Sequence, residues 1–382
     1  MELGFLKPLF DRPGPWASVY VETTRTTEDA AKLQQLRNRS VAGRLVDEGA
    51  APATVRAVMD RLAREPVSGT PPGRALFATG DEVVLDLALA QAPPTEDVTW
   101  STLPHVAPLV VLRGEELTCL VAYIDRTGAD LELRQAHRRE SVGQAQGKEW
   151  RGRGHRSIPA DRYEWHYRNK VEKTWDETAD VIASELVRQW PENDPALLVL
   201  TGDSRERRAV YSRLPQHIQA VAVEAGSGSR QAGSSTTVLD EQIEEACDRY
   251  ERERLQSALD RFRIGRGRPG EHRTSTVDTG PGQAAEGIPA VVDAARKHQV
   301  ATLLIDRNAS DAGRQVWIGP GPDDVAVQRG DARAVGVAEP EQARADDALL
   351  RAAVAADCEV LVVPEGMGGP AGGLGAVLRW SD

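Results

Sequence analysis

The segment Trp150–Arg156 reads WRGRGHR and combines three arginines, two glycines and one histidine in seven residues. Guanidinium groups pair with phosphate oxygens and stack on bases, while glycines give the backbone the freedom to enter a narrow site. We therefore expect a projecting basic loop that inserts into structured RNA, with a solvated loop as the alternative. The candidate RNA-contacting residues are Arg151, Gly152, Arg153, Gly154, His155, Arg156, Arg162, Arg168 and Lys170.

Basic residues are concentrated around this loop in a chain that is acidic overall. The 382 residues contain 47 Lys and Arg against 58 Asp and Glu, which gives a formal net charge of −11. Between residues 134 and 173, however, eleven Lys or Arg face five acidic residues, a local charge of +6. The overall charge argues against a protein covered in nucleic acid, whereas the local excess favours a single RNA-binding segment on an acidic body.

Other chemical motifs are absent or incomplete. Residues 143–148, GQAQGK, have three residues between the glycines where a phosphate-binding loop has four, and Glu149 replaces its magnesium-binding Ser or Thr. Cys119, Cys247 and Cys358 are more than a hundred residues apart, so their spacing indicates neither a disulfide framework nor a zinc site. We expect no catalytic residue, no metal site and no cofactor.

One long helix should follow the basic loop directly. Aromatic or aliphatic side chains recur every four positions across residues 161–190, and Pro159 and Pro191 stand just outside the two ends. At 1.5 Å per residue this helix is about 45 Å long. A β-hairpin over residues 118–135 precedes the loop, so the loop should join a small sheet to the long helix.

The alternation of predicted elements indicates an α/β protein with three domains. We expect an N-terminal α+β domain at 1–115, a middle α/β domain with the basic loop at 116–248 and a C-terminal α/β domain at 249–382. Further helices are expected at 27–45, 52–65, 285–297 and 341–356. Further strands are expected at 74–80, 82–89, 197–201, 218–223, 300–305, 315–318 and 359–363.

The sequence shows no targeting signal. No run approaches the roughly 18 consecutive apolar residues of a transmembrane helix. The N-terminal residues lack the basic start and the long apolar stretch of a signal peptide. We expect a cytoplasmic protein without a membrane partner.

The order of hairpin, Arg/Gly loop, long helix and strand–Gly-Asp-Ser–helix resembles the middle domain of archaeal and eukaryotic class I release factors and of Pelota. The stretch KVEKTWDETA at 170–179 is similar to the family's KVAETA sequence. Counting back from Asp176 without gaps places the family's Gly-Gly-Gln motif on Arg153-Gly154-His155. The resemblance covers roughly residues 116–382, and its C-terminal part is similar to a family domain related to small RNA-binding ribosomal proteins.

This resemblance implies a translation factor without peptide release. In release factors the Gln and its glycines position water for hydrolysis of peptidyl-tRNA, and here Arg153 and His155 replace the first Gly and the Gln. The Arg- and Ala-rich composition fits the bacterial branch of this lineage, which includes ribosome hibernation factors similar to Balon. The resemblance therefore implies a stress-response factor that binds ribosomal RNA in the vacant A site of the ribosome. Its loop would lie near the peptidyl-transferase centre, and its partner would be elongation factor Tu or another translational GTPase.

Two other functions remain open. The first is a Pelota-like rescue factor that acts with a translational GTPase and a splitting ATPase. The second is a peptidyl-tRNA hydrolase or RNA nuclease in which His155 acts as a base and nearby arginines clamp phosphate. The enzyme would need a second titratable group beside His155, and the sequence marks none.

Overall fold

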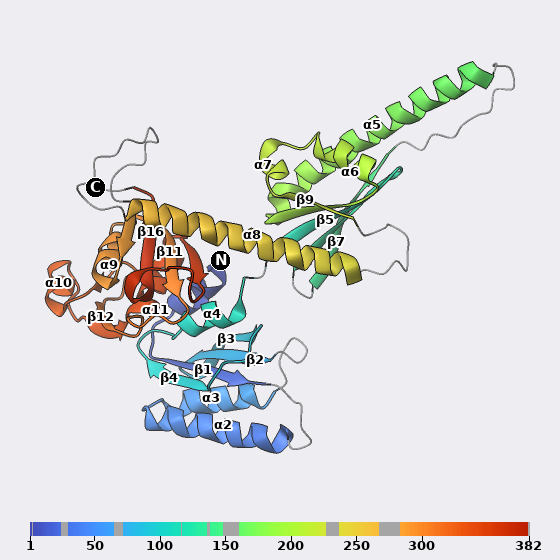
Figure 1. Ribbon diagram of the computed structural model, residues 1–382. Helices are drawn as coiled ribbons and strands as arrows, with labels where there is room; N and C mark the ends of the chain where they lie inside the picture. Colours follow the sequence, from blue (N-terminus) through green and yellow to red (C-terminus); the bar gives the residue numbers. More distant parts are fainter. Residues whose placement is uncertain are drawn as a thin grey trace, which may run out of the picture. The chain divides into compact units, whose positions relative to one another are not determined.

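The chain forms two compact units. The first combines Met1–Glu115 with Leu255–Asp382, and the second is Glu116–Arg254. The computed structural model describes residues 1, 3–23, 30–64, 72–115, 117–135, 138–147, 160–226, 237–266 and 283–380. Within these ranges, the side chains of residues 30–33 and 160–174 are not described. Helices and strands alternate through both units, which confirms the predicted α/β class (Figure 1).

The first unit contains an antiparallel sheet in the order β3-β2-β1-β4. Its strands are β1 (Trp16–Glu22), β2 (Gly73–Thr79), β3 (Glu82–Leu89) and β4 (Asp97–Ser101). Helices α2 (Ala30–Asp47) and α3 (Pro52–Leu62) lie on one face of this sheet and bury Val41, Leu45 and Val58 against it (Figure 1). Because side chains alternate along a strand, Trp16 and Tyr20 of β1 point to the other face.

The same unit contains two further sheets, in the orders β10-β16-β11-β15 and β13-β12-β14. Their strands are β10 (Ala284–Glu286), β11 (Val300–Asp306), β12 (Gln315–Ile318), β13 (Val325–Ala326), β14 (Glu341–Arg344), β15 (Glu359–Val363) and β16 (Leu374–Leu378). The helices of this part are α9 (Ile288–Arg296), α10 (Arg329–Ala334), α11 (Ala345–Ala355) and the short η2 (Ala371–Gly373). The N-terminal segment adds η1 (Gly4–Leu6), α1 (Lys7–Phe10) and α4 (Ala107–Arg113).

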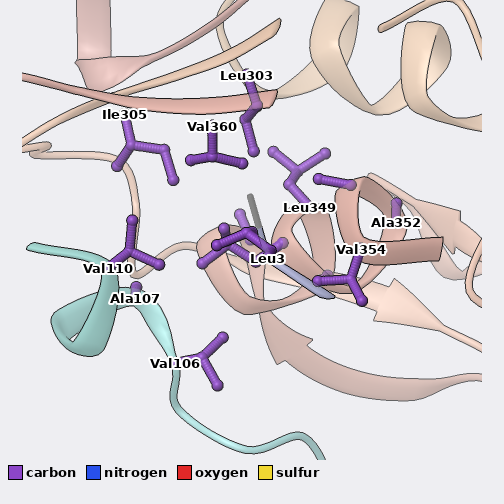
Figure 2. Packing of buried hydrophobic residues seen from close by; sticks show 14 of the residues in the cluster. Leu3, Val106, Ala107, Val110, Leu303, Ile305, Leu349, Ala352, Val354 and Val360 are labelled. Atoms are coloured by element: carbon purple, nitrogen blue, oxygen red, sulfur yellow. The ribbon is translucent and has the colours of Figure 1, made fainter. Parts of the chain in front are cut away.

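The N-terminal and C-terminal segments of this unit share one hydrophobic core. Figure 2 shows Leu3 and Val110 packed among Leu303, Leu349 and Val360, all of them buried. Apolar surface from both segments is therefore removed from water in a single cluster, which explains why they fold together. The expected boundary at 115/116 coincides with a limit between the units, whereas the boundary at 248/249 falls inside a helix. The division into three domains stays a prediction.

The second unit is built on the sheet β7-β6-β5-β8-β9. Its strands are β5 (Thr118–Asp125), β6 (Gly128–Gln135), β7 (Arg138–Gln146), β8 (Leu197–Gly202) and β9 (Ala222–Ala225). Strands β5 and β6 form the predicted hairpin, and β5, β8 and β9 run parallel. Both the hairpin and the parallel component are confirmed.

Helices cover both faces of this sheet. They are α5 (Ala160–Asn193), α6 (Ser204–Tyr211), α7 (Gln216–Gln219) and α8 (Thr237–Gly265). Leu120 and Ala122 of β5 pack with α5, while the alternating Cys119 and Val121 pack with the first half of α8. None of the helices in the described ranges has the length and apolar character needed to cross a bilayer.

Several expected elements are wrong in type or extent. A strand was expected at 218–223, but the strand β9 begins only at Ala222 and residues 216–219 form helix α7, because Pro215 starts a turn that buries Ile218. The helices expected at 285–297 and 341–356 each begin with a strand, because β10 pairs with β16 and β14 pairs with β12. Pairing between distant strands outweighs local helix propensity there.

The sequence analysis assigned no helix or strand to the polar segment after residue 135. Residues 138–146 form the strand β7, which includes most of the GQAQGK sequence. Its residues are mostly exposed because β7 lies at the edge of the sheet. The long helix predicted at 161–190 is confirmed, although Pro191 lies inside its last turn.

Candidate nucleic-acid interface

The predicted RNA-contacting residues follow strand β7. The loop residues Arg151, Gly152, Arg153, Gly154, His155 and Arg156 lie outside the described residues. Arg162, Arg168 and Lys170 lie in helix α5, where the backbone is described but these side chains are not. The described structure thus fixes where the chain leaves the sheet and where it enters the helix.

The chain leaves the sheet at Gly147, against helix α5. The backbone N–H of Gly147 donates to the carbonyl oxygen of Thr127 at 2.8 Å. A Cβ atom at this position would lie 2.3 Å from the hydroxyl oxygen of Thr178 on α5, so the close approach requires glycine. Gln189 of α5 also donates from Nε2 to the carbonyl oxygen of Val142 in β7 at 3.0 Å. These contacts fix the end of β7 to the second half of α5.

Helix α5 is anchored to its unit through this second half. Its residues Ala179, Ile182, Ala183 and Leu186 are buried in the core beneath the sheet. The first part of the helix, residues 160–174, extends beyond the sheet (Figure 1). At 1.5 Å per residue these residues span about 22 Å. Arg162, Arg168 and Lys170 therefore lie on the projecting part of the helix.

The basic residues before the loop are neutralised inside the unit. Arg134 is buried, with its Nε 2.6 Å from Glu132, and it also contacts Asp240 of α8. Arg139 lies 2.8 Å from the same Asp240. Arg138 pairs with Glu140 at 2.7 Å. These three arginines were part of the local +6, and their charge is largely compensated.

The rest of the basic excess lies in the sequence of residues 148–173, here called the basic segment. It contains eight Lys or Arg and four Asp or Glu. It also contains Trp150, Tyr163, Trp165 and Tyr167, side chains on which bases stack. The composition of the basic segment, together with its place at the end of a projecting helix, suits contact with RNA.

A small cavity that the sequence did not predict lies beside helix α5, at residues that follow the basic segment in the chain. Trp175 of α5 has the guanidinium carbons of Arg126 and Arg205 at 5.0 and 4.8 Å from its ring centroid. The cavity measures about 130 Å³ and is also lined by Glu206 and Ile124. Burial, with the nearby charge of Asp203, raises the pKa of Glu206. Cation–π contacts here connect α5 to the end of β5 and the start of α6.

Three potential metal ligands, His105, Asp346 and Asp347, come together in the other unit. Their polar atoms are engaged with one another and with the protein. His105 Nδ1 lies 2.8 Å from Asp347, and Asp346 accepts a hydrogen bond from Arg344 at 2.6 Å. Asp347 also accepts from the backbone N–H of Val106 at 2.8 Å. The three residues therefore form a buried ion-pair cluster, which links the segment before α4 to α11 within this unit.

The sequence of the second unit matches a described protein family. Residues 118–268 match the model of bacterial archaeo-eukaryotic release factor family 2. The whole chain is also similar to the uncharacterized proteins Rv2629 and MT2704 of Mycobacterium tuberculosis strains H37Rv and CDC 1551. It is 26% identical to each over 385 aligned residues, which cover 98% of this chain and 96% of the relative.

A comparison with solved structures finds three proteins whose names refer to translation. Archaeal translation termination factor aRF1 is 16% identical, with a TM-score of 0.24, over 98% of this chain and 96% of that one. Dom34 of S. cerevisiae, a translation termination-like factor, is 9% identical, with a TM-score of 0.38, over 81% and 80%. A chain in a model of ribosome-bound archaeal Pelota and ABCE1 is 13% identical, with a TM-score of 0.38, over 99% and 94%. All three TM-scores lie below 0.5.

Proposed function

We propose that the chain is a ribosome-binding translation factor that contacts ribosomal RNA through the basic segment. The observation that carries this proposal is the distribution of charge along the second unit. Arg134, Arg138 and Arg139 are held in ion pairs, whereas residues 148–173 have twice as many basic as acidic residues. The family match over residues 118–268 includes the whole basic segment and supports a relation to release factors.

The finer proposal is a hibernation factor that occupies the vacant A site, similar to Balon. A helix that extends about 22 Å beyond its anchored half suits a binding site recessed within RNA. In this proposal Arg151, Arg153 and Arg156 contact phosphates near the peptidyl-transferase centre. Elongation factor Tu or another translational GTPase is the proposed delivery partner.

We further propose that the factor does not release peptides. Arg153-Gly154-His155 stands at the position that the resemblance assigns to Gly-Gly-Gln. An arginine restricts the backbone where the family has its first glycine, and a histidine base needs a partner that orients it. Wild-type protein should leave ribosome-bound peptidyl-tRNA intact. Hydrolysis that disappears in His155→Ala would instead establish the enzyme.

Sedimentation with vacant 70S ribosomes tests the binding proposal. The protein should move with the ribosomes at low salt and return to the top of the gradient as salt rises, because phosphate contacts release counterions. Protein that stays at the top even at low salt would overturn the proposal.

A second gradient separates hibernation from rescue. Ribosomes carrying the bound factor are incubated with a translational GTPase, a splitting ATPase and their nucleotides. The hibernation proposal predicts intact 70S particles. Separation into subunits that depends on the factor would favour the Pelota-like rescue function.

A further inference from the structure

Cys119 and Cys247 are brought into contact in the second unit. Cys119 lies on β5 and Cys247 on α8, 128 positions further along the chain, and their Sγ atoms are 3.3 Å apart. The sequence spacing of the cysteines did not predict this contact, because the packing of α8 on the sheet brings together residues that are far apart in the chain. Both are free thiols in the structure.

The elements that carry the two thiols are firmly packed. Cys119 is 1% exposed and lies on the middle strand of the sheet. Around it, Leu239, Ile243 and Ala246 of α8 are buried against the same face. Cys247 lies at the border of this cluster and is partly exposed. One thiol is therefore open to a small reagent, and the other is held beside it.

We propose that Cys119 and Cys247 are an oxidation site that closes to an intramolecular disulfide when the protein meets a hydroperoxide. The sulfur atoms must approach by roughly 1 Å to reach the bond length of about 2.05 Å. Each sulfur already lies beside its partner, so closure needs a side-chain adjustment and not a rearrangement of β5 or α8.

The reaction has two balanced steps. The Cys247 thiolate attacks one oxygen of hydrogen peroxide, the O–O bond breaks, and a sulfenic acid forms while the second oxygen leaves as water after taking up a proton. The Cys119 sulfur then attacks the Cys247 sulfur, the S–O bond breaks, and the oxygen leaves as a second water with the proton of Cys119. The two sulfurs are oxidised and the two peroxide oxygens are reduced.

The surroundings assign different roles to the two cysteines. The hydrogen bond with Cys247, together with burial, raises the pKa of the Cys119 thiol. The same hydrogen bond lowers the pKa of Cys247, against the effects of burial and of Glu251 and nearby acidic residues. Cys247 is also the partly exposed member of the pair, so it meets the peroxide first, and the buried Cys119 resolves the sulfenic acid.

The disulfide would fix the first half of α8 to the sheet. Because it closes a loop of 128 positions, it restricts the unfolded chain strongly. It also holds α8 in the register that places Asp240 beside Arg134 and Arg139. Oxidation therefore stabilises the unit and preserves the ion pairs next to β7.

The test uses the full chain, treated with increasing hydrogen peroxide and then quenched. Free thiols are counted by maleimide labelling of the denatured protein, and peptides are mapped by mass spectrometry without reduction. Cys358→Ala is the matched control, because Cys358 lies in the other unit and its Sγ contacts the carbonyl oxygen of Val300. Cys119→Ala and Cys247→Ala each remove one member of the pair.

Wild type and Cys358→Ala should each lose two thiols and yield one peptide pair joined through Cys119 and Cys247. The oxidised protein should unfold about 5 °C higher than the reduced protein, and a reductant should reverse the shift. Neither variant of the pair should form the link. Oxidation of Cys247 to sulfinic acid without the disulfide, or loss of the Cys358 thiol before the pair, would overturn the proposal. The peptide map is made on the wild type, so the test of the disulfide remains valid even if a variant fails to fold.

Discussion

His105 Nδ1 lies 2.8 Å from a carboxylate oxygen of Asp347, although the two residues are 242 positions apart. The other oxygen of Asp347 accepts hydrogen bonds from the backbone N–H groups of Val106 and Ala107, at the start of α4. His105 Nε2 lies 3.5 Å from Asp97. A single buried carboxylate thus connects α11 to the N-terminal segment and helps to explain why the two ends of the chain form one unit.

The stability of this unit should fall as pH rises above neutrality. Burial disfavours the charged imidazole, but the Asp347 carboxylate outweighs it and raises the pKa of His105 to about 10. The folded-state pKa is above the unfolded value of about 6.5, so this stabilisation is complete below pH 6.5 and is lost as pH approaches 10. Chemical denaturation at pH 7 and pH 10 should show a decrease of about 3 kcal/mol in the free energy of unfolding.

The other titratable groups near His105 do not reverse the expected loss of stability at high pH. Burial and the charge of Asp347 raise the pKa of Asp346 to about 6, so Asp346 titrates below this pH range. Arg344 stays charged, and burial raises the pKa of Tyr20. His105→Gln keeps a donor beside Asp347 but cannot titrate, and its stability should change less between pH 7 and 10. An equal decrease in this variant would show that His105 is not the cause.

Gly147→Ala should weaken the attachment of α5 to the end of β7. The added Cβ would meet the Thr178 hydroxyl oxygen at 2.3 Å and its methyl carbon at 2.8 Å. Such overpacking costs about 1–3 kcal/mol, measurable by urea denaturation. Thr178→Ala removes both atoms, so the double variant should recover part of the loss, with a coupling energy of at least about 0.5 kcal/mol. Additive effects would contradict the close contact.

Trp175→Ala should destabilise the second unit by about 2–4 kcal/mol. The substitution removes the contacts with Arg126 and Arg205 and enlarges the cavity beside them. Trp175→Phe keeps an aromatic face for the two arginines and should lose less stability than Trp175→Ala. The matched control is Trp380→Ala, because Trp380 is 48% exposed. Equal losses for Trp175→Ala and Trp380→Ala in urea denaturation would exclude the proposed role of the two arginines.

Local patterns predicted the elements that have strong periodicity or clear ends. The hairpin β5–β6 and helix α5 were predicted because apolar alternation, a glycine turn and flanking prolines are visible in sequence. Strand β7 was missed because RRESVGQAQ is polar, as the edge of a sheet allows. The union of the N- and C-terminal segments depends on contacts such as His105–Asp347, which no local pattern encodes.

The sequence predicted which residues make up the candidate interface, but it overestimated the net positive charge of the region. The count of basic residues included Arg134 and Arg139, whose common partner Asp240 is about a hundred positions away. The contact between Cys119 and Cys247 was missed for the same reason, since only the packing of α8 reveals it. Contacts between distant residues therefore lower the net charge of the predicted basic region, and they also create the proposed oxidation site.

The salt dependence of ribosome binding tests the central claim most directly. Dissociation constants for vacant 70S ribosomes are measured over a range of salt for the wild type, Arg151→Ala/Arg153→Ala/Arg156→Ala and a control with the same charge change. The control replaces Arg252, Arg261 and Arg333, which are exposed and lie outside the basic segment.

The loop variant should bind more weakly, and the slope of log K against log salt should become shallower by about 2–3, roughly one for each lost phosphate contact. The control variant should keep the wild-type slope. RNA contact through the basic segment would be contradicted if the loop variant kept the wild-type slope. It would also be contradicted if the control variant lost as much affinity and slope as the loop variant.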